Sequence, residues 1–403
     1  MHRIRWGLVA AVVAVTALAA ATQVTARPQA DPIKIGISLP LTGRFSEPGQ
    51  AAERGYRVWA ALTNKSGGLL KRKVQLIIRD DASDQNTIVS DYNRLITEDK
   101  VDLLLGTFSS FLNLPASSVA ERNRMAFVAP AGGSPAIFAR HYKYYFFAQQ
   151  ATAPHQADLF AAWLKKLPNH PTKVAYPTLN DPFTKPVIDG IQSKLEPAGF
   201  RTVYSKVYPT DTTDFDTIAD AIKSGGADVV VHGATFEDGV GLIRSLRKLD
   251  YNPKVLFQTT APTVTSEYAQ AIGRNNTEGI LYAVSWSARA GGKKFPQNHD
   301  FLLAFEKAYK GALPEEDAAD AFASAQVLAA AVKATKSLDN DKISDWLHSH
   351  PVRTILGPLS WDADGAPRQS FFLGQWQRGI PQIVAPKVIA TTKKVVYPKP
   401  AWS

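Results

Sequence analysis

Short apolar runs alternate with longer helix-like stretches along the chain, and this alternation limits the possible folds more than any other feature. The first series has its strand-like runs at 33–41 (IKIGISLPL), 73–83 (KVQLIIRDDAS), 101–106 (VDLLLG) and 125–133 (MAFVAPAGG). A second series follows at 173–181 (KVAYPTLND), 227–234 (ADVVVHGA) and 254–260 (KVLFQTT). Strands that alternate with helices are typical of parallel sheets with crossover helices. Two such series in tandem predict two similar α/β lobes.

The size and composition of the chain agree with two lobes. It has 403 residues, of which 45% are hydrophobic and 20% are charged, and a chain of this length buries more than one core. The first 26 residues (MHRIRWGLVAAVVAVTALAAATQVTA) have a basic start, an apolar stretch and a small-x-small site ending at Ala26. This layout predicts a cleavable signal peptide at 1–26. The alternative is an uncleaved anchor, but the apolar stretch is short for a membrane-spanning helix.

The absence of cysteine and the spread of charge narrow the setting further. The sequence contains no cysteine, which excludes disulfides, thiolate metal sites and a lipid-bearing cysteine. We therefore expect a periplasmic protein that is exported without a lipid anchor. The net charge is +10, but the basic residues are interleaved with acids, so we expect no nucleic-acid partner. We also expect no cofactor and no metal, since neither DDASD (80–84) nor DADG (362–365) has the pattern of a calcium loop.

Two hydroxyl residues stand where a buried strand gives way to a helix. In LLLGTFSSFLNLPASS (103–118), Ser109 and Ser110 follow the apolar run. Ligands bind at the carboxyl ends of strands in open α/β sheets, and a helix N-terminus suits an anion. A simpler interpretation is that these serines cap the helix, and the two roles can coexist.

A second turn of the same kind follows the next strand. In APAGGS, the residues Ala131, Gly132 and Gly133 would let the backbone approach a ligand closely. The alternative is a glycine-rich turn that contacts no ligand.

The order of these motifs resembles a known family. IKIGISLPLTGRFSEPGQ near the start, VDLLLGTFSSFLNLPASSVAE, FVAPAGGSPAIF and the closing ILGPLSWDADGAPRQSFFLGQWQ look like the type I periplasmic binding proteins of the leucine/isoleucine/valine-binding family. The resemblance implies two Rossmann-like lobes with parallel sheets flanked by helices, joined by a three-segment hinge that closes over a ligand. It also implies a binding subunit that delivers a small molecule to the membrane permease of an ABC importer.

The resemblance assigns ligand contacts residue by residue. It implies that Ser109 and Ser110 hold a ligand carboxylate, that Phe183 stands where the family often has a tyrosine, and that Thr235 and Phe236 lie where another aromatic residue is usual. Phe45 would join Phe183 and Phe236 in an apolar wall, although each of the three is equally consistent with a core position.

Two departures from the family pattern concern the ligand's amino group. Gly133 replaces a threonine, and no acid stands near Ala261, where the family often has one. These departures weigh against an α-amino acid. We therefore expect a small carboxylate-bearing ligand, either an amino acid or an aromatic or aliphatic acid, with the plain acid favoured.

We place the first lobe at 32–150 with 277–350, the second at 151–276 with 351–386, and a surface tail at 387–403. We expect a monomer.

A binding protein for a chemoreceptor or sensor kinase is the main alternative function. A serine hydrolase is disfavoured, because the sequence has no G-x-S-x-G elbow and no motif that ties a histidine to a nucleophile. We therefore expect no enzyme activity.

Overall fold

The computed structural model describes residues 30–168, 171–290 and 297–403. The predicted signal peptide at 1–26 lies outside these ranges. Within them, none of the helices combines the length and the apolar character that crossing a membrane requires.

The first sheet is entirely parallel. Its strand order is β2-β1-β3-β4-β5, and the strands are β1 (Ile33–Leu39), β2 (Val74–Asp80), β3 (Leu103–Leu105), β4 (Phe127–Ala129) and β5 (Tyr145–Phe147).

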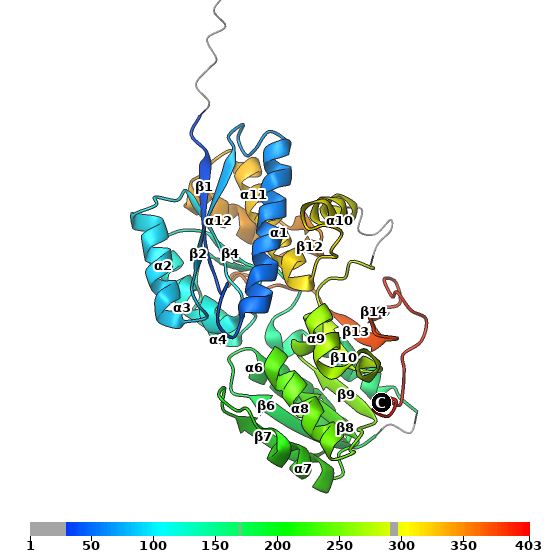
Figure 1. Cartoon of the computed structure of the whole chain (residues 1–403). Coiled ribbons are helices and arrows are strands. Elements are labelled where there is room, and N and C mark those ends of the chain that lie inside the picture. Colours follow the sequence, from blue (N-terminus) through cyan, green and yellow to red (C-terminus); the bar gives the residue numbers. More distant parts are fainter. Residues whose placement is uncertain (1–29, 169–170, 291–296) are drawn as a thin grey trace, which may run out of the picture. The chain divides into compact units, whose positions relative to one another are not determined.

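Helices cover both faces of this sheet (Figure 1). Leu103 and Leu105 belong to the core on one face and Leu104 to the core on the other, as strand alternation requires. The first face carries α1 (Ser46–Lys65), α10 (Gln297–Ala308), α11 (Glu316–Thr335) and α12 (Asn340–Ser349). The second face carries α2 (Gln85–Thr97), α3 (Ser110–Arg122) and α4 (Pro135–Phe138).

Helices α1 and α11 pack with their backbones in contact. A Cβ atom added to Gly55 of α1 would lie 2.0 Å from the carbonyl oxygen of Ala318 of α11. Only glycine permits this approach. It fixes the position of the first turn of α11, which matters for the site described below.

The second sheet is mixed. Its order is β14-β13-β10-β9-β8-β6-β7, with β13 antiparallel to both of its neighbours. The strands are β6 (Lys173–Leu179), β7 (Arg201–Tyr208), β8 (Val229–His232), β9 (Val255–Gln258), β10 (Leu281–Val284), β13 (Phe372–Gln377) and β14 (Ile380–Ala385).

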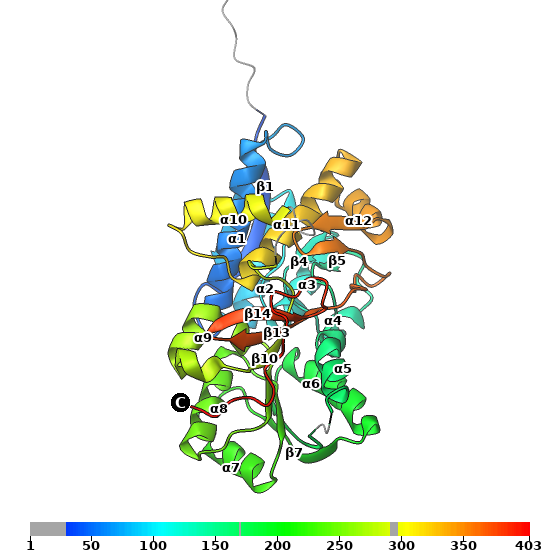
Figure 2. The same cartoon turned by 90° about the vertical axis from the view of Figure 1, so that its right-hand side faces the viewer.

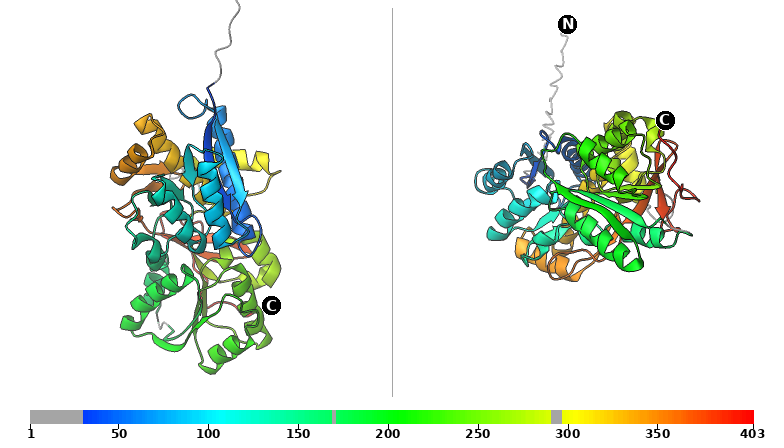
Figure 3. Two further views of the ribbon diagram at one scale, coloured as in Figure 1. Left: turned by 90° about the vertical axis from the view of Figure 1, so that its left-hand side faces the viewer. Right: turned by 90° about the horizontal axis from the view of Figure 1, so that it is seen from below.

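This sheet also carries helices on both faces (Figures 2 and 3). One core contains Val174 and Tyr176 with α5 (Asp158–Lys165) and α6 (Thr184–Leu195). The opposite core contains Ala175 with α7 (Asp216–Ser224), α8 (Phe236–Lys248) and α9 (Thr265–Ile272). We call each sheet with its helices a lobe, and the two Rossmann-like lobes agree with the fold expected from the sequence.

Two boundaries between the lobes differ from those expected. The boundary at 277 is wrong, because β10 pairs with β9 and β13 in the second sheet. The boundary at 351 is also wrong, because β11 (Val352–Thr354), β12 (Gly357–Leu359) and Trp361 pack in the core of the first lobe. A strand's own residues do not determine which sheet it joins, since strand pairing depends on distant segments.

The three chain segments that join the sheets are hydrogen-bonded to one another. They follow β5, follow β10 and precede β13. The Gln150 side chain in the first segment donates to the carbonyl oxygen of Ser285 in the second at 2.8 Å. Its backbone oxygen accepts from the backbone nitrogen of Gln369 in the third, also at 2.8 Å. Gln150 therefore ties together all three segments of the hinge.

The segment at 387–403 runs along the second lobe. Most of it is exposed or half-buried, as expected for a surface tail, but Lys399 is buried. Tyr397 and Trp402 pack against the cores on opposite faces of the second sheet. The tail is thus anchored at its end.

Candidate functional site

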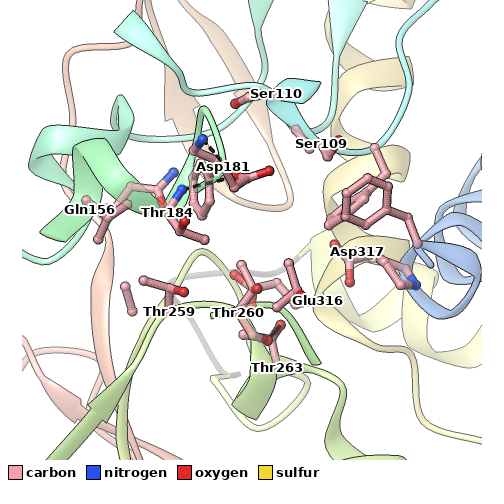
Figure 4. A pocket seen from close by; sticks show the side chains of 18 of the residues that line it. Ser109, Ser110, Gln156, Asp181, Thr184, Thr259, Thr260, Thr263, Glu316 and Asp317 are labelled. Carbon is pink, nitrogen blue, oxygen red and sulfur yellow. Dashed lines mark hydrogen bonds between the residues drawn. The ribbon is translucent and has the colours of Figure 1, made fainter. Parts of the chain in front are cut away.

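A pocket lies where strands of both sheets end (Figure 4). It encloses about 990 Å³, counted with its solvent-open part. Eight of the ten site residues predicted from the sequence line it: Phe45, Ser109, Ser110, Ala131, Gly132, Phe183, Thr235 and Phe236. Whether they contact a ligand stays a prediction.

The serine turn offers hydrogen-bond donors to the pocket. The Ser109 hydroxyl oxygen caps α3 by accepting from the backbone nitrogen of Leu112 at 3.3 Å. The Ser110 hydroxyl oxygen accepts from the backbone nitrogen of Ser134 at 3.1 Å. Neither hydroxyl donates to any described residue, so both hydrogens are free for an anion. Capping and ligand binding are therefore compatible here, as the sequence suggested.

Ser109 also has an unusual backbone. Its φ is 71° and its ψ is 153°, a region that residues other than glycine rarely adopt and that costs about 1–3 kcal/mol. Such conformations cluster at functional sites.

We expect Ser109→Gly to raise the free energy of unfolding by about 0.5–1.5 kcal/mol. Relief of backbone strain outweighs the lost cap and the added chain entropy. Urea unfolding measures the change. Ser134→Gly is the matched control, because Ser134 caps α4 with an ordinary φ of −63°, and it should be destabilising. Equal losses in the two variants would contradict the assignment of strain.

The glycine turn after β4 contributes less than expected. Ala131 and Gly132 line the pocket, and Gly132 has a φ of +116°. Gly133 does not line it. A Cβ atom on Gly133 would lie 3.0 Å from the Phe147 ring, so packing inside the lobe accounts for this glycine.

Ala261 is also outside the pocket lining. It is fully buried in a short 3-10 helix (Ala261–Thr263) and lies against Gly239 of α8. Among the other residues expected in the second lobe, Thr235 caps α8 in a reciprocal bond with Asp238. Phe183 and Phe236 form part of the apolar wall of the pocket.

Carboxylates line much of the remaining wall, and the sequence analysis missed them. They are Asp181, Glu316, Asp317 and Asp320, and Arg44 is the single base among the described lining residues. Asp181 accepts from the backbone nitrogens of Phe183 and Thr184. Its other oxygen is 3.7 Å from the Arg44 guanidinium, which lies over the Phe45 ring. Burial raises the pKa of Asp181, and its hydrogen bonds and Arg44 oppose that rise.

The first two turns of α11 supply the other three acids. Glu316 accepts from the backbone nitrogen of Ser285 in the hinge. Asp320 accepts from the Ser285 hydroxyl at 2.7 Å and from the Gln149 side chain. Burial raises the pKa of Glu316 to about 7 and raises those of Asp317 and Asp320 well above the usual value. Glu316 and Asp320 therefore connect the pocket wall to the hinge.

Of these acids, only Asp320 stands in a sequence context that could have revealed it. Glu316 and Asp317 follow Pro314, a position where acids ordinarily complement a helix dipole. Asp320, however, stands in a run of alanines that faces the core, and an acid in such a run requires a partner.

Across the described residues, no group of histidines and acids has the arrangement of a metal site.

Comparisons with known proteins agree with this fold. The profile of the family described as "Periplasmic binding protein" matches residues 32–380. An amino acid binding protein of Pseudomonas aeruginosa is 27% identical over 334 residues, which cover 83% of this chain and 87% of that protein.

Two solved structures share the fold. One is a branched-chain amino acid transporter substrate binding protein from Streptococcus pneumoniae in complex with isoleucine; its TM-score is 0.75 at 19% identity, covering 88% of this chain and 100% of that one. The other is an ABC transporter solute binding protein from R. palustris in complex with benzoate; its TM-score is 0.76 at 19% identity, covering 91% and 99%. With two Rossmann-like lobes, a three-segment hinge and a family match over most of its length, the chain belongs to the periplasmic binding protein family, type I.

Proposed function

We propose that this chain is the extracytoplasmic solute-binding subunit of an ABC importer of the branched-chain amino acid type. In this proposal it works as a periplasmic monomer that traps a small carboxylate-bearing ligand between its lobes and passes it to a membrane permease. The observation that carries the proposal is the serine turn, where two hydroxyl hydrogens without acceptors stand at the N-terminus of α3 inside the pocket. This arrangement suits a carboxylate.

The comparisons support both the setting and the range of ligands. Members of this family are extracytoplasmic binding proteins, and the two structural neighbours hold isoleucine and benzoate. These two ligands share a carboxylate on an apolar body. We propose that the chain has no catalytic activity. In support of this, the described residues that line the pocket include no histidine that could activate Ser109 or Ser110.

A thermal-shift panel of amino acids, aromatic acids, aliphatic acids and amides tests the proposal on the purified protein. A ligand present at 100 times its dissociation constant adds about 2.7 kcal/mol of stability, which gives a measurable rise in melting temperature. A panel in which carboxylate-bearing compounds produce no shift, while uncharged amides do, would contradict the proposed ligand class.

We expect the best ligand of the panel to close the hinge. A ligand that contacts both lobes binds the closed state better and shifts the population toward it. Small-angle X-ray scattering should then show a smaller radius of gyration with the ligand than without it. A compound from the panel that gives no thermal shift serves as the control. An unchanged scattering curve at saturation would rule out trapping between the lobes.

A further inference from the structure

A second pocket lies on the other face of strand β10, and we call it the side pocket. Along this strand, Ala283 lines the pocket described above, here called the main pocket, whereas Tyr282 and Val284 line the side pocket. Side chains alternate between the two faces of a strand in this way. The side pocket encloses about 1480 Å³, counted with its solvent-open part. Of the described residues, Thr263 and Glu316 line both pockets, so the two pockets share a wall.

Both lobes contribute to the side pocket. The second lobe supplies Tyr282 and Trp376, which pack in one of its cores, and Ile380 at the start of β14. The first lobe supplies Trp286, which packs in its core, and residues 312–316, which lead into α11. Movement at the hinge therefore changes the distance between the walls. A ligand that contacts both walls binds one hinge angle better than another.

Aromatic and aliphatic side chains form much of the wall. The two tryptophans have no polar group left to offer, because the Trp286 indole nitrogen donates to the Asn298 side chain at 3.0 Å and the Trp376 indole nitrogen donates to the backbone oxygen of Pro262 at 3.2 Å. Leu313, which is 53% exposed, adds to the apolar lining. Such a surface suits the apolar body of a ligand.

Three hydrogen-bond donors of the side pocket lack acceptors. Tyr282 is only 3% exposed, yet its hydroxyl donates to none of the described residues. Arg274 and Arg289 are exposed residues of the lining. Neither forms an ion pair in the described part of the chain, although that part contains every Asp and Glu of the sequence. Gly379 makes room for Arg274, since a Cβ atom there would lie 2.4 Å from the Arg274 Nε atom.

The acids of the side pocket do not balance these two arginines. Glu315 is paired with Arg54 at 2.9 Å. Glu316 accepts from the Ser285 backbone nitrogen, and burial raises its pKa to about 7, so it is partly protonated at neutral pH. The side pocket therefore carries an excess of positive charge. The main pocket has the opposite balance, with four carboxyl groups and Arg44 as the single base among its described lining residues.

We infer that the side pocket binds a small organic anion with an aromatic body. Its acid group lies at the two arginines, and its rings pack against the two tryptophans. Because the walls belong to different lobes, this anion acts as an effector: it favours one hinge angle and thereby changes the affinity of the main pocket for its ligand. The site is separate from the one that carries the proposed function, and it adds regulation to that function.

A fluorescent anion tests the inference on the unmodified protein. The probe is 8-anilinonaphthalene-1-sulfonate, which joins a sulfonate to aromatic rings, and N-phenyl-1-naphthylamine is the matched probe without the charge. The protein is first saturated with the best ligand of the thermal-shift panel, which keeps the main pocket filled. We expect one anionic probe per chain, bound about 10-fold tighter or more than the uncharged probe, the lower end for a hydrogen bond to a charged group. If the anion binds no more tightly than the uncharged probe, the inference is overturned.

Substitution of the arginines locates the probe. Arg274→Gln combined with Arg289→Gln should weaken the anionic probe by about 10-fold or more. Arg353→Gln is the control, because Arg353 is an exposed arginine of β11 that lines neither pocket, and it should leave the affinity unchanged. A double variant that binds the probe as well as the unmodified protein does would place the probe elsewhere and contradict the inference.

Calorimetry of the main-pocket ligand tests the coupling between the two sites. A saturating concentration of the anionic probe should change the dissociation constant of the best panel ligand by about 5-fold or more, and that ligand should change the dissociation constant of the probe by the same factor. The double arginine variant should lose both changes. Affinities that are independent of each other would rule out an effector. If no compound of the panel binds, the proposed function fails, whereas the difference between the two probes and its loss in the double variant remain measurable.

Discussion

Ser110→Ala is expected to weaken the carboxylate-bearing ligand by about 1.5–3 kcal/mol, roughly 10-fold to 150-fold in dissociation constant. The Ser110 side chain is 1% exposed, and its hydroxyl accepts from Ser134 without donating to any described residue. Alanine removes the hydrogen offered to the ligand. It also leaves the Ser134 backbone nitrogen without its acceptor, so the turn that approaches the ligand loses support.

Titration calorimetry with the best ligand of the panel measures this loss. Ser117→Ala is the matched control, because Ser117 is a buried serine of the same helix whose hydroxyl donates to the backbone oxygen of Leu114. It should leave the affinity within about 2-fold of the unmodified protein. Similar losses in both variants would show that damage to α3, rather than a missing ligand contact, explains the result.

Glu316→Gln is expected to raise the free energy of unfolding at pH 8 by about 1–3 kcal/mol and to leave it nearly unchanged near pH 4.5. Burial raises the pKa of Glu316 from 4.5 in the unfolded chain to about 7 in the folded one. Between these values the folded protein holds a proton that the unfolded chain releases. Stability is therefore lost as the pH rises through this window, and glutamine removes that loss.

Urea unfolding at the two pH values measures the difference. Glutamine keeps an oxygen that can accept from the Ser285 backbone nitrogen, so the hinge contact persists. Glu237→Gln, which changes an exposed acid, should have no effect at either pH. If the gain from Glu316→Gln at pH 8 is no larger than the gain at pH 4.5, then Glu316 is not held in its protonated form by burial.

The order of strands and helices could be predicted from the sequence, because each element carries its own pattern. The apolar run at 101–106 and the capping serines after it need only local information, and the structure has a strand and a helix there. Placing the lobe boundaries, expected at 277 and 351, required information about pairing with distant strands. Residues 281–284 have the pattern of a strand that could join either sheet, and their pairing with β9 and with residues 372–375 assigns them to the second.

In the candidate site, too, residues placed by a local sequence pattern could be predicted, and residues placed by contacts with distant segments could not. Residues at the ends of strands, such as Ser110 and Thr235, reach the pocket because parallel strands end at one edge of a sheet. Asp317 was missed because an acid in the first turn of a helix ordinarily complements the helix dipole in water. Its place in the pocket depends on the contact between Gly55 and Ala318, which the local sequence of α11 does not reveal.

That contact also affects the order in which the chain can fold. Strands β6 to β9 and their helices occupy one continuous stretch, 173–258, so much of the second lobe can assemble as soon as it has been synthesised. The first lobe cannot, because α1 covers only part of its face of the sheet and the remainder stays exposed until α11 has been made. Large apolar surfaces that wait for a distant segment are prone to aggregation. Synthesis of this chain thus leaves the N-terminal lobe unfinished while the lobe that follows it takes shape.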